Sequence, residues 1–185
     1  ALVYGNAVHA ALRKWGLSVQ DGLPLSLDQF IAEFDNYLVD REILTDAERA
    51  NLLAQGKEDL PRYYDERLKE GIPYVHKVEY PLSANFDDIP LKGKIDRIDL
   101  ENPNSANATI IDFKTGAPKT ESEIRGGDYH RQLVFYSLLF EHSNSILKPS
   151  AFVLDFVGEG SNYPVQRSFH ITEEDRAALR KLIKF

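Results

Sequence analysis

The chain has 185 residues, of which 43% are hydrophobic and 28% charged, an ordinary composition for one globular domain with its own core. It contains no cysteine, which excludes disulfides, thiolate zinc sites and cysteine-ligated iron–sulfur clusters. No apolar run approaches the roughly 20 residues that a membrane helix needs, and no charged-then-apolar signal segment opens the chain. We therefore expect a cytoplasmic, intracellular domain that spans residues 1–185 and has no membrane partner.

The net charge of −7 bears on the partners of this chain. A stand-alone module that binds nucleic acid is usually basic, because it must offset the charge of the phosphate backbone. We therefore expect weak binding of nucleic acid by this domain alone, with larger partner domains holding such a polymer. The chain also contains no methionine, even at its first position, which indicates a piece excised from a longer protein.

Three helices are predicted in the first part of the chain. Residues 7–15 follow Asn6, a residue type that favours the N-cap position, and their apolar side chains recur at helical spacing. Residues 26–40 and 45–70 each begin with a capping box, and we expect Pro61 to kink or split the last helix. The apolar stripes of these helices are typical of a core face rather than of a ligand site.

The central stretch, residues 91–116, predicts two strands joined by a polar loop. Residues 94–99 alternate charged and apolar side chains, which is the pattern of a half-buried strand. Residues 109–114 are rich in β-branched and aromatic types, and the loop before them consists largely of turn formers. Such a short connection favours an antiparallel pair, which brings Asp96 close to Asp112.

The acidic residues of this hairpin stand beside a lysine. Asp112 and Lys114 are two apart on one strand, so both side chains leave the same face, while Phe113 points into a core on the other. With Asp96 one strand over, they form a charged cluster whose hard oxygen ligands suit Mg²⁺ or Mn²⁺. Beside a metal, the lysine can orient a water, help it lose its proton or stabilise charge on a phosphate. By itself, however, Asp-x-Lys is a common tripeptide and favours a surface pair on a solvated strand.

The remaining segments predict further strands and helices. These are an extended segment over 73–84, a mobile polar loop over 119–127, a helix over 128–142, a hairpin of strands 150–157 and 165–171 around the turn 158–164, and a final helix from 172 to the end with Leu182 and Ile183 inward. Gln132 and Tyr136 are four apart and share one helix face. There they can hydrogen-bond a phosphate or hold Lys114 in place, and a half-buried amide and phenol without such a role is the alternative.

Four short motifs follow one another along the chain. They are Gly5-Asn6-Ala7-Val8-His9, Gly93-x-Ile95-Asp96-Arg97-Ile98-Asp99, Ile111-Asp112-Phe113-Lys114-Thr115-Gly116 and Gln132-Leu133-x-x-Tyr136. Their order resembles that of the RecB-like nucleases of the PD-(D/E)XK superfamily, which include the nuclease domains fused to UvrD/Rep-type helicases. The resemblance covers most of the chain, from His9 to about Tyr136. Its specificity lies in the order of the motifs, each on the right predicted element.

The resemblance implies an α/β fold, with a mixed central β-sheet flanked by helices and a restriction-endonuclease-like core. It also implies ligands for one or two metal ions. Asp96 and Asp112 are the expected carboxylate ligands, and His9 matches the histidine of the family's first motif. Glu79 matches a glutamate on the strand before the first aspartate, and the backbone carbonyl of Phe113 is a further implied ligand. Without the resemblance, His9 is a hydrogen-bonded rim residue and Glu79 is a surface carboxylate.

The function that the resemblance implies is hydrolysis of phosphodiester bonds in DNA with Mg²⁺, for which Mn²⁺ can substitute, and without an iron–sulfur cluster. The expected catalytic residues are Asp96, Asp112, Lys114, Gln132 and Tyr136. Lys114 is expected to position or activate the water, and the amide and phenol to support the lysine and the phosphate. The expected role is that of an exonuclease in DNA repair or recombination, with DNA and a helicase domain or subunit as partners.

Two other classes of function remain open. One is a nuclease fold without catalysis that serves as a DNA-binding or scaffolding module. Such domains usually lose one of the Asp or Lys positions, whereas Asp96, Asp112 and Lys114 are all present. The other is a metal-dependent enzyme that acts on a different phosphate substrate, or a binding module whose charges form a solvated face. The ordered set of four motifs counts against this last class.

Overall fold

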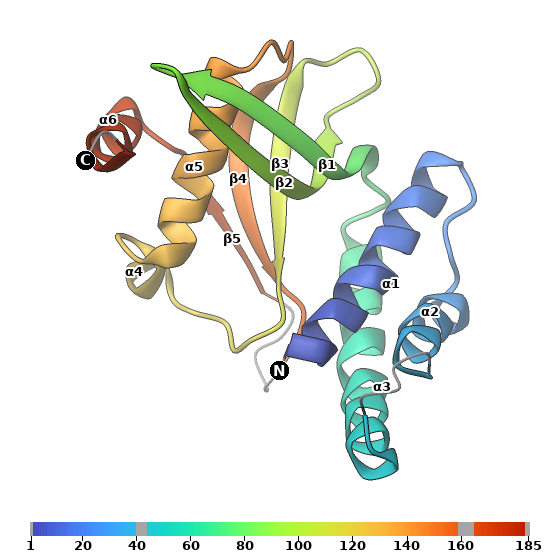
Figure 1. The fold of residues 1–185 in the computed structure, drawn as a ribbon. Helices are drawn as coiled ribbons and strands as arrows, with labels where there is room; N and C mark the ends of the chain where they lie inside the picture. Colours follow the sequence, from blue (N-terminus) through green and yellow to red (C-terminus); the bar gives the residue numbers. More distant parts are fainter. Residues whose placement is uncertain (1, 40–43, 159–164, 184–185) are drawn as a thin grey trace.

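The computed structural model describes residues 2–39, 44–158 and 165–183, and Figure 1 shows a sheet with helices on both of its faces. The helices are α1 (Leu2–Gln20), α2 (Leu27–Val39), α3 (Asp46–Lys69), α4 (Glu121–Ile124), α5 (Asp128–His142) and α6 (Glu173–Ile183). The strands are β1 (Tyr74–Phe86), β2 (Ile89–Leu100), β3 (Asn107–Lys114), β4 (Lys148–Phe156) and β5 (Val165–Phe169). The predictions for residues 40, 159–164 and 184–185 lie outside the described residues. None of the described helices is long and apolar enough to cross a membrane.

The five strands form one mixed sheet in the order β1-β2-β3-β4-β5, which confirms the predicted fold class. Strands β2 and β3 pair antiparallel, with Arg97 opposite Ile111, as the short loop between them predicted. Strand β4 runs parallel to β3, because the chain returns through α4 and α5 before entering it. Strand β5 pairs antiparallel with β4, as expected of a hairpin. Strand β3, which carries Asp112, is therefore the central strand of the sheet.

Two apolar cores lie on the two faces of the sheet, and adjacent residues of β3 belong to different ones. Ile110 packs into the core shared with α5, whereas Ile111 packs into the core shared with α1, α2 and α3. Figure 1 shows α5 on one side of the sheet and the three N-terminal helices on the other. The direction in which a β3 side chain points therefore decides which helical layer it meets.

Local helix signals are confirmed where side chains cap the first turn. Before α2, Gln29 N donates to Ser26 Oγ at 3.3 Å, and Ser26 N donates to Gln29 Oε1 at 2.9 Å. Thr45 and Glu48 form the same capping box at the start of α3. Helix α3 continues through Pro61, so the expected split did not occur. The buried side chains on either side of the proline hold this helix in the core and outweigh the lost hydrogen bond.

Three predictions of local detail are wrong. Asn6 is not an N-cap but lies inside α1, because the helix begins four residues before it and its first turn already has a buried side chain. Residues 119–127 are not one continuous loop, because a capping box of Thr120 and Glu123 opens the short helix α4. Leu182 does not point inward, since its side chain is 65% exposed. None of the described residues of α6 is buried, so this helix touches the core only along one edge.

The alternation expected along β2 is interrupted at Asp96. Ile95 and Ile98 both pack into the core on the α5 side, although residues three apart on a regular strand point to opposite faces. Arg97 faces α1 instead, where its guanidinium carbon lies 5.6 Å from the centroid of the Trp15 ring. The pairing of β2 with β3 extends only to Arg97, so Asp96 lies where the ladder ends.

Candidate active site

Strand β3 and helix α5 bring together four of the predicted side chains. Asp112 and Lys114 leave β3 on the face that α5 covers, and Gln132 and Tyr136 reach them from α5. The Lys114 Nζ lies 2.5 Å from Asp112 Oδ2 and 2.7 Å from Gln132 Oε1. Because the Lys114 side chain is only 16% exposed, its ammonium is held inside the structure between a carboxylate and an amide.

The hydroxyl of Tyr136 links these side chains to β2. It accepts a hydrogen bond from Gln132 Nε2 at 3.0 Å, and it lies 3.1 Å from Asp112 Oδ1 and 3.2 Å from the carbonyl oxygen of Lys94. Burial and the nearby charge of Asp112 raise the pKa of Tyr136 well above its ordinary value. The phenol is therefore a neutral donor, and its single proton is shared between two acceptors.

Close packing and an aromatic ring also fix the position of the lysine. A Cβ at Gly93 would lie 2.7 Å from Leu139 Cδ1, so the absence of a side chain there allows α5 to approach β2. The Lys114 Nζ lies 4.6 Å from the centroid of the Tyr129 ring, which adds a cation–π contact to its two polar partners.

Asp96 is oriented by the main chain of β3. Its Oδ2 accepts a hydrogen bond from Phe113 N at 2.8 Å, and its Oδ1 lies 3.5 Å from His9 Nδ1. Burial disfavours the charged imidazole, but the neighbouring carboxylate of Asp96 outweighs burial and raises the pKa of His9. The structure thus places His9 of α1 beside the first of the two predicted aspartates.

The two aspartates are close enough for the charge of one to affect the other. Burial raises the pKa of Asp112, Lys114 offsets this in part, and the charge of Asp96 raises it further. Asp112 Oδ2 is buried and makes no hydrogen bond of normal geometry with any described residue. Two carboxylates that repel each other, with an imidazole nearby, are donors of the kind that divalent cations bind. The chemical types of these three side chains therefore fit a divalent metal ion.

The predicted ligands are not gathered at one point. Among the residues that the structure describes, no group of three His, Asp or Glu side chains is arranged to hold a metal ion. The reason is that each carboxylate already has an internal partner: Asp96 is turned to His9 and Phe113 N, and Asp112 to Lys114. The assignment of these side chains as metal ligands stays a prediction.

Glu79 is bound by two cationic side chains. Its carboxylate lies 2.9 Å from Arg13 Nε and 3.2 Å from Lys94 Nζ. Its φ of 45° is in the left-handed region, which residues other than glycine rarely adopt. Such strained conformations persist where the surroundings hold them, and they cluster at functional sites. A metal role for Glu79 also stays a prediction.

A groove of about 590 Å³ runs along α1 beside His9 and Asp96. Three cationic side chains line it, Arg13, Lys14 and Lys94, although the chain as a whole has a net charge of −7. We call it the α1 groove. The sequence analysis did not single out these cations, although the four-residue spacing of His9 and Arg13 places both on one helix face. Glu33, Glu79 and Asp96 also line the groove, and Glu79 pairs with Arg13 and Lys94, so the groove presents both signs of charge.

Two carboxylates and a lysine at the end of a mixed sheet, beside a groove lined by charged side chains, are typical of sites that act on phosphate esters. The family model of the PD-(D/E)XK nuclease superfamily matches residues 1–184, and the chain belongs to that superfamily. Nucleases are hydrolases of phosphodiester bonds, and those of this superfamily generally depend on divalent metal ions. No curated protein was found to match the sequence.

A solved structure shares the fold. A protein from Eubacterium rectale named as a candidate exonuclease matches with a TM-score of 0.60 and 18% sequence identity, over 100% of this chain and 63% of that chain. The structure of SSO0001 matches with a TM-score of 0.41 and 15% identity, over 97% of this chain and 71% of that chain. The first likeness supports the restriction-endonuclease-like α/β core. The chain spans less than two thirds of the length of that protein.

Proposed function

We propose that this domain hydrolyses phosphodiester bonds in DNA with the help of Mg²⁺ or Mn²⁺. The observation that carries the proposal is the position of the Lys114 ammonium, which is held between Asp112 and Gln132 on the central strand of a nuclease fold. A cationic donor fixed in advance can stabilise the charge that develops on a phosphate without reorganisation during the reaction.

In this proposal Asp96, Asp112 and His9 hold the cation, with Glu79 and the carbonyl of Phe113 as further predicted ligands. When bound, a divalent cation lowers the pKa of water and offsets charge on the phosphate oxygens. Asp96 is already aimed by the main chain, because its Oδ2 accepts a hydrogen bond from Phe113 N. The chain therefore presents one carboxylate in a fixed orientation and one beside the lysine.

The other residues of the site orient the water and the substrate. Lys114 holds the attacking water or the scissile phosphate, and Gln132 keeps its ammonium in position at 2.7 Å. Tyr136 fixes Gln132 in turn. Arg13 and Lys94 line the α1 groove and offer cationic partners for phosphates on either side of the cleaved bond.

We further propose that the domain is an exonuclease of the RecB-like type within a helicase–nuclease of DNA repair or recombination. The support is the order of the four sequence motifs and the likeness to the larger candidate exonuclease from Eubacterium rectale, of which this chain covers 63%. A net charge of −7 suits a domain whose partner, a helicase domain or subunit, supplies most of the affinity for DNA.

The test is cleavage of end-labelled linear single- and double-stranded DNA with Mg²⁺, Mn²⁺ or EDTA. We expect cutting by the wild type with either metal, and loss of cutting in Asp112→Asn and Lys114→Ala. Lys148→Ala, which removes an exposed lysine outside the site, is the matched control and keeps activity. A product ladder that starts from the ends identifies an exonuclease. No cutting in either metal, with no rise in melting temperature on adding metal, would overturn the proposal and favour a DNA-binding or scaffolding module.

A further inference from the structure

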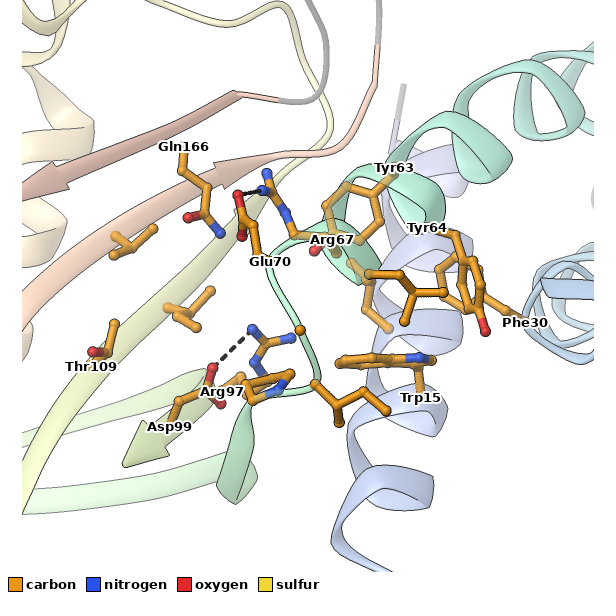
Figure 2. Close-up of a pocket in the computed structure, with 17 residues that line it drawn as sticks. Trp15, Phe30, Tyr63, Tyr64, Arg67, Glu70, Arg97, Asp99, Thr109 and Gln166 are labelled. Atoms are coloured by element: carbon orange, nitrogen blue, oxygen red, sulfur yellow. Dashed lines mark hydrogen bonds and ion pairs between the residues drawn. The ribbon is translucent and has the colours of Figure 1, made fainter. Parts of the chain in front are cut away.

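The arginine side chains of this chain are, with one exception, paired with carboxylates. Figure 2 shows two such pairs beside α1 and α3, where Arg67 pairs with Glu70 and Arg97 pairs with Asp99. Among the residues that the structure describes, every other arginine except Arg167 also forms an ion pair with a carboxylate. The charge of Arg167, which belongs to β5, is therefore not offset in the way that is usual in this chain.

Arg167 points to the same face of the sheet as Lys114. It lies opposite Leu154 in the pairing of β4 with β5, and Leu154 packs into the core on the α5 side. Because cross-strand partners share a face, Arg167 points to the α5 side too. Its Nε donates to the carbonyl oxygen of Lys119 at 3.1 Å, in the segment between β3 and α4. The other N–H groups of this guanidinium have no hydrogen-bond partner among the described residues.

Lys119 and Lys114 lie against the same aromatic ring. The Lys119 Nζ is 4.7 Å from the centroid of the Tyr129 ring, and the Lys114 Nζ is 4.6 Å from it. The two ammoniums are therefore no farther apart than the sum of these distances. Tyr129 precedes Gln132 by three residues on α5, so the ring and the amide that contact Lys114 share one helix face. The segment after β3 thus brings a second lysine close to the first.

Little negative charge offsets these cations. Among the described residues, Lys119 and Arg167 form no ion pair, and Lys114 pairs with Asp112 alone. Hydrogen bonds from Thr120 lower the pKa of the nearby Glu123, and the charge of Lys119 adds to this. That carboxylate is engaged by Thr120, however, whose N and Oγ1 lie 2.7 and 2.6 Å from Glu123 Oε2. Like charges held near one another repel, so the arrangement indicates an anion as their partner.

We propose that Lys119 and Arg167 bind the phosphate groups of a DNA strand that lie next to the scissile one. We call Lys114, Lys119 and Arg167 the basic track. An ammonium binds phosphate as a point charge, and a guanidinium offers paired N–H donors that match two phosphate oxygens. Lys119 is exposed and Arg167 half-buried, so a strand can reach both. That the phosphate at Lys114 is the cleaved one rests on the proposed nuclease function, whereas phosphate binding by Lys119 and Arg167 does not.

The first probe is thymidine 3′,5′-bisphosphate, which carries two phosphate groups on one nucleoside and has no phosphodiester bond to cleave. Its binding is followed in EDTA by proton–nitrogen correlation spectra, with thymidine 5′-monophosphate measured in parallel. We expect saturable shifts of the Lys119 and Thr120 amide signals. We also expect the bisphosphate to bind about two- to fivefold more tightly than the monophosphate, as one added exposed charge pair provides.

Substitutions on the basic track should weaken binding of the bisphosphate. Lys119→Gln and Arg167→Gln should each raise its dissociation constant by about two- to fivefold. Arg131→Gln is the matched control, because it removes one positive charge from α5 that is already paired with Asp128, and it should leave the constant unchanged. Melting temperatures of all three variants show whether the fold is retained.

Tyr129 is the positioning residue in this proposal. Tyr129→Phe keeps the ring that both ammoniums contact and should bind the bisphosphate as the wild type does. Tyr129→Leu removes the ring and should weaken binding. A purely structural role for Tyr129 would lower the melting temperature of the leucine variant without changing its affinity for the bisphosphate.

The second probe is a labelled single-stranded oligonucleotide, titrated in EDTA from low ionic strength upwards by fluorescence anisotropy. Each phosphate contact on a single strand contributes about 0.7 to the slope of log affinity against log salt concentration. Lys119→Gln and Arg167→Gln should therefore each reduce this slope by about 0.7, and Arg131→Gln should not. This arm separates a site for a DNA strand from a site for a free nucleotide.

Three outcomes would overturn the proposal. These are no saturable response to the bisphosphate, equal affinities in the wild type, Lys119→Gln and Arg167→Gln, and no binding of the oligonucleotide by the wild type. Weaker binding of the bisphosphate with an unchanged salt slope would assign the site to a free nucleotide and overturn the assignment to a strand. If both probes respond as expected but the wild type cuts no DNA, the nuclease proposal fails and the basic track remains a phosphate-binding site.

Discussion

Removing the hydroxyl of Tyr136 perturbs the candidate site without changing its charge. In Tyr136→Phe, Asp112 Oδ1 loses a donor at 3.1 Å and Gln132 Nε2 loses an acceptor at 3.0 Å. A neutral hydrogen bond contributes about 0.5–1.5 kcal/mol net, and leaving a buried acceptor unpaired costs about 1–3 kcal/mol. Because Asp112 is only 3% exposed, water does not replace the lost donor. We expect the free energy of unfolding to fall by about 2–3 kcal/mol.

The assay is urea unfolding in EDTA, where a lower midpoint with an unchanged slope measures lost stability. Tyr64→Phe is the matched control, because the Tyr64 hydroxyl has one neutral acceptor, the carbonyl oxygen of Leu25 at 2.8 Å. That variant should lose only about 1 kcal/mol. If Tyr136→Phe lowers the free energy of unfolding no more than Tyr64→Phe does, the Tyr136 hydroxyl does not support Asp112. The reasoning about the hydrogen bonds of Tyr136 would then be wrong. DNA cleavage should also fall by about 10–100-fold, as is usual when an outer partner of a site is removed.

Two further substitutions test the surroundings of the site. Glu79→Gln should strengthen DNA binding and steepen its salt dependence in EDTA, measured by fluorescence anisotropy, because Arg13 and Lys94 lose the carboxylate that now pairs with both. Weaker binding would contradict this. Gly56→Ala should lower the melting temperature despite the better helix propensity of alanine, because the added Cβ would lie 2.2 Å from Phe34 Cε1. The cost of such overpacking is typically about 1–3 kcal/mol, and a melting temperature at or above that of the wild type would show that the ring moves aside.

The parts of the site that could be predicted depend on signals near one another in the sequence. The turn-forming loop and the β-branched strand after it were enough to predict the antiparallel pair of β2 and β3. The two-residue spacing of Asp112 and Lys114 and the four-residue spacing of Gln132 and Tyr136 each place two side chains on one face. These four side chains meet in the structure because β3 and α5 are adjacent, an arrangement that the resemblance supplied.

The parts that could not be predicted depend on contacts between distant segments. The alternation along β2 fails at Asp96 because the next residue, Arg97, turns to the Trp15 ring of α1. The left-handed backbone of Glu79 is held by Arg13 and Lys94 from two other elements. Buried polar atoms without a partner among the described residues likewise come from distant elements, Trp15 Nε1 from α1, Arg67 Nε from α3 and Arg97 Nε from β2, and no local pattern marks such a set.

The backbone N–H of Phe113 donates to the side chain of Asp96 on the neighbouring strand β2. Its amide resonance in a proton–nitrogen correlation spectrum is therefore sensitive to the orientation of that carboxylate. A cation that rotates Asp96 would shift this signal, while amides within the paired part of β3, such as that of Ile111, would stay in place. The central strand thus contains an internal probe of ion binding that works without DNA, and it works equally well in variants that cannot cleave.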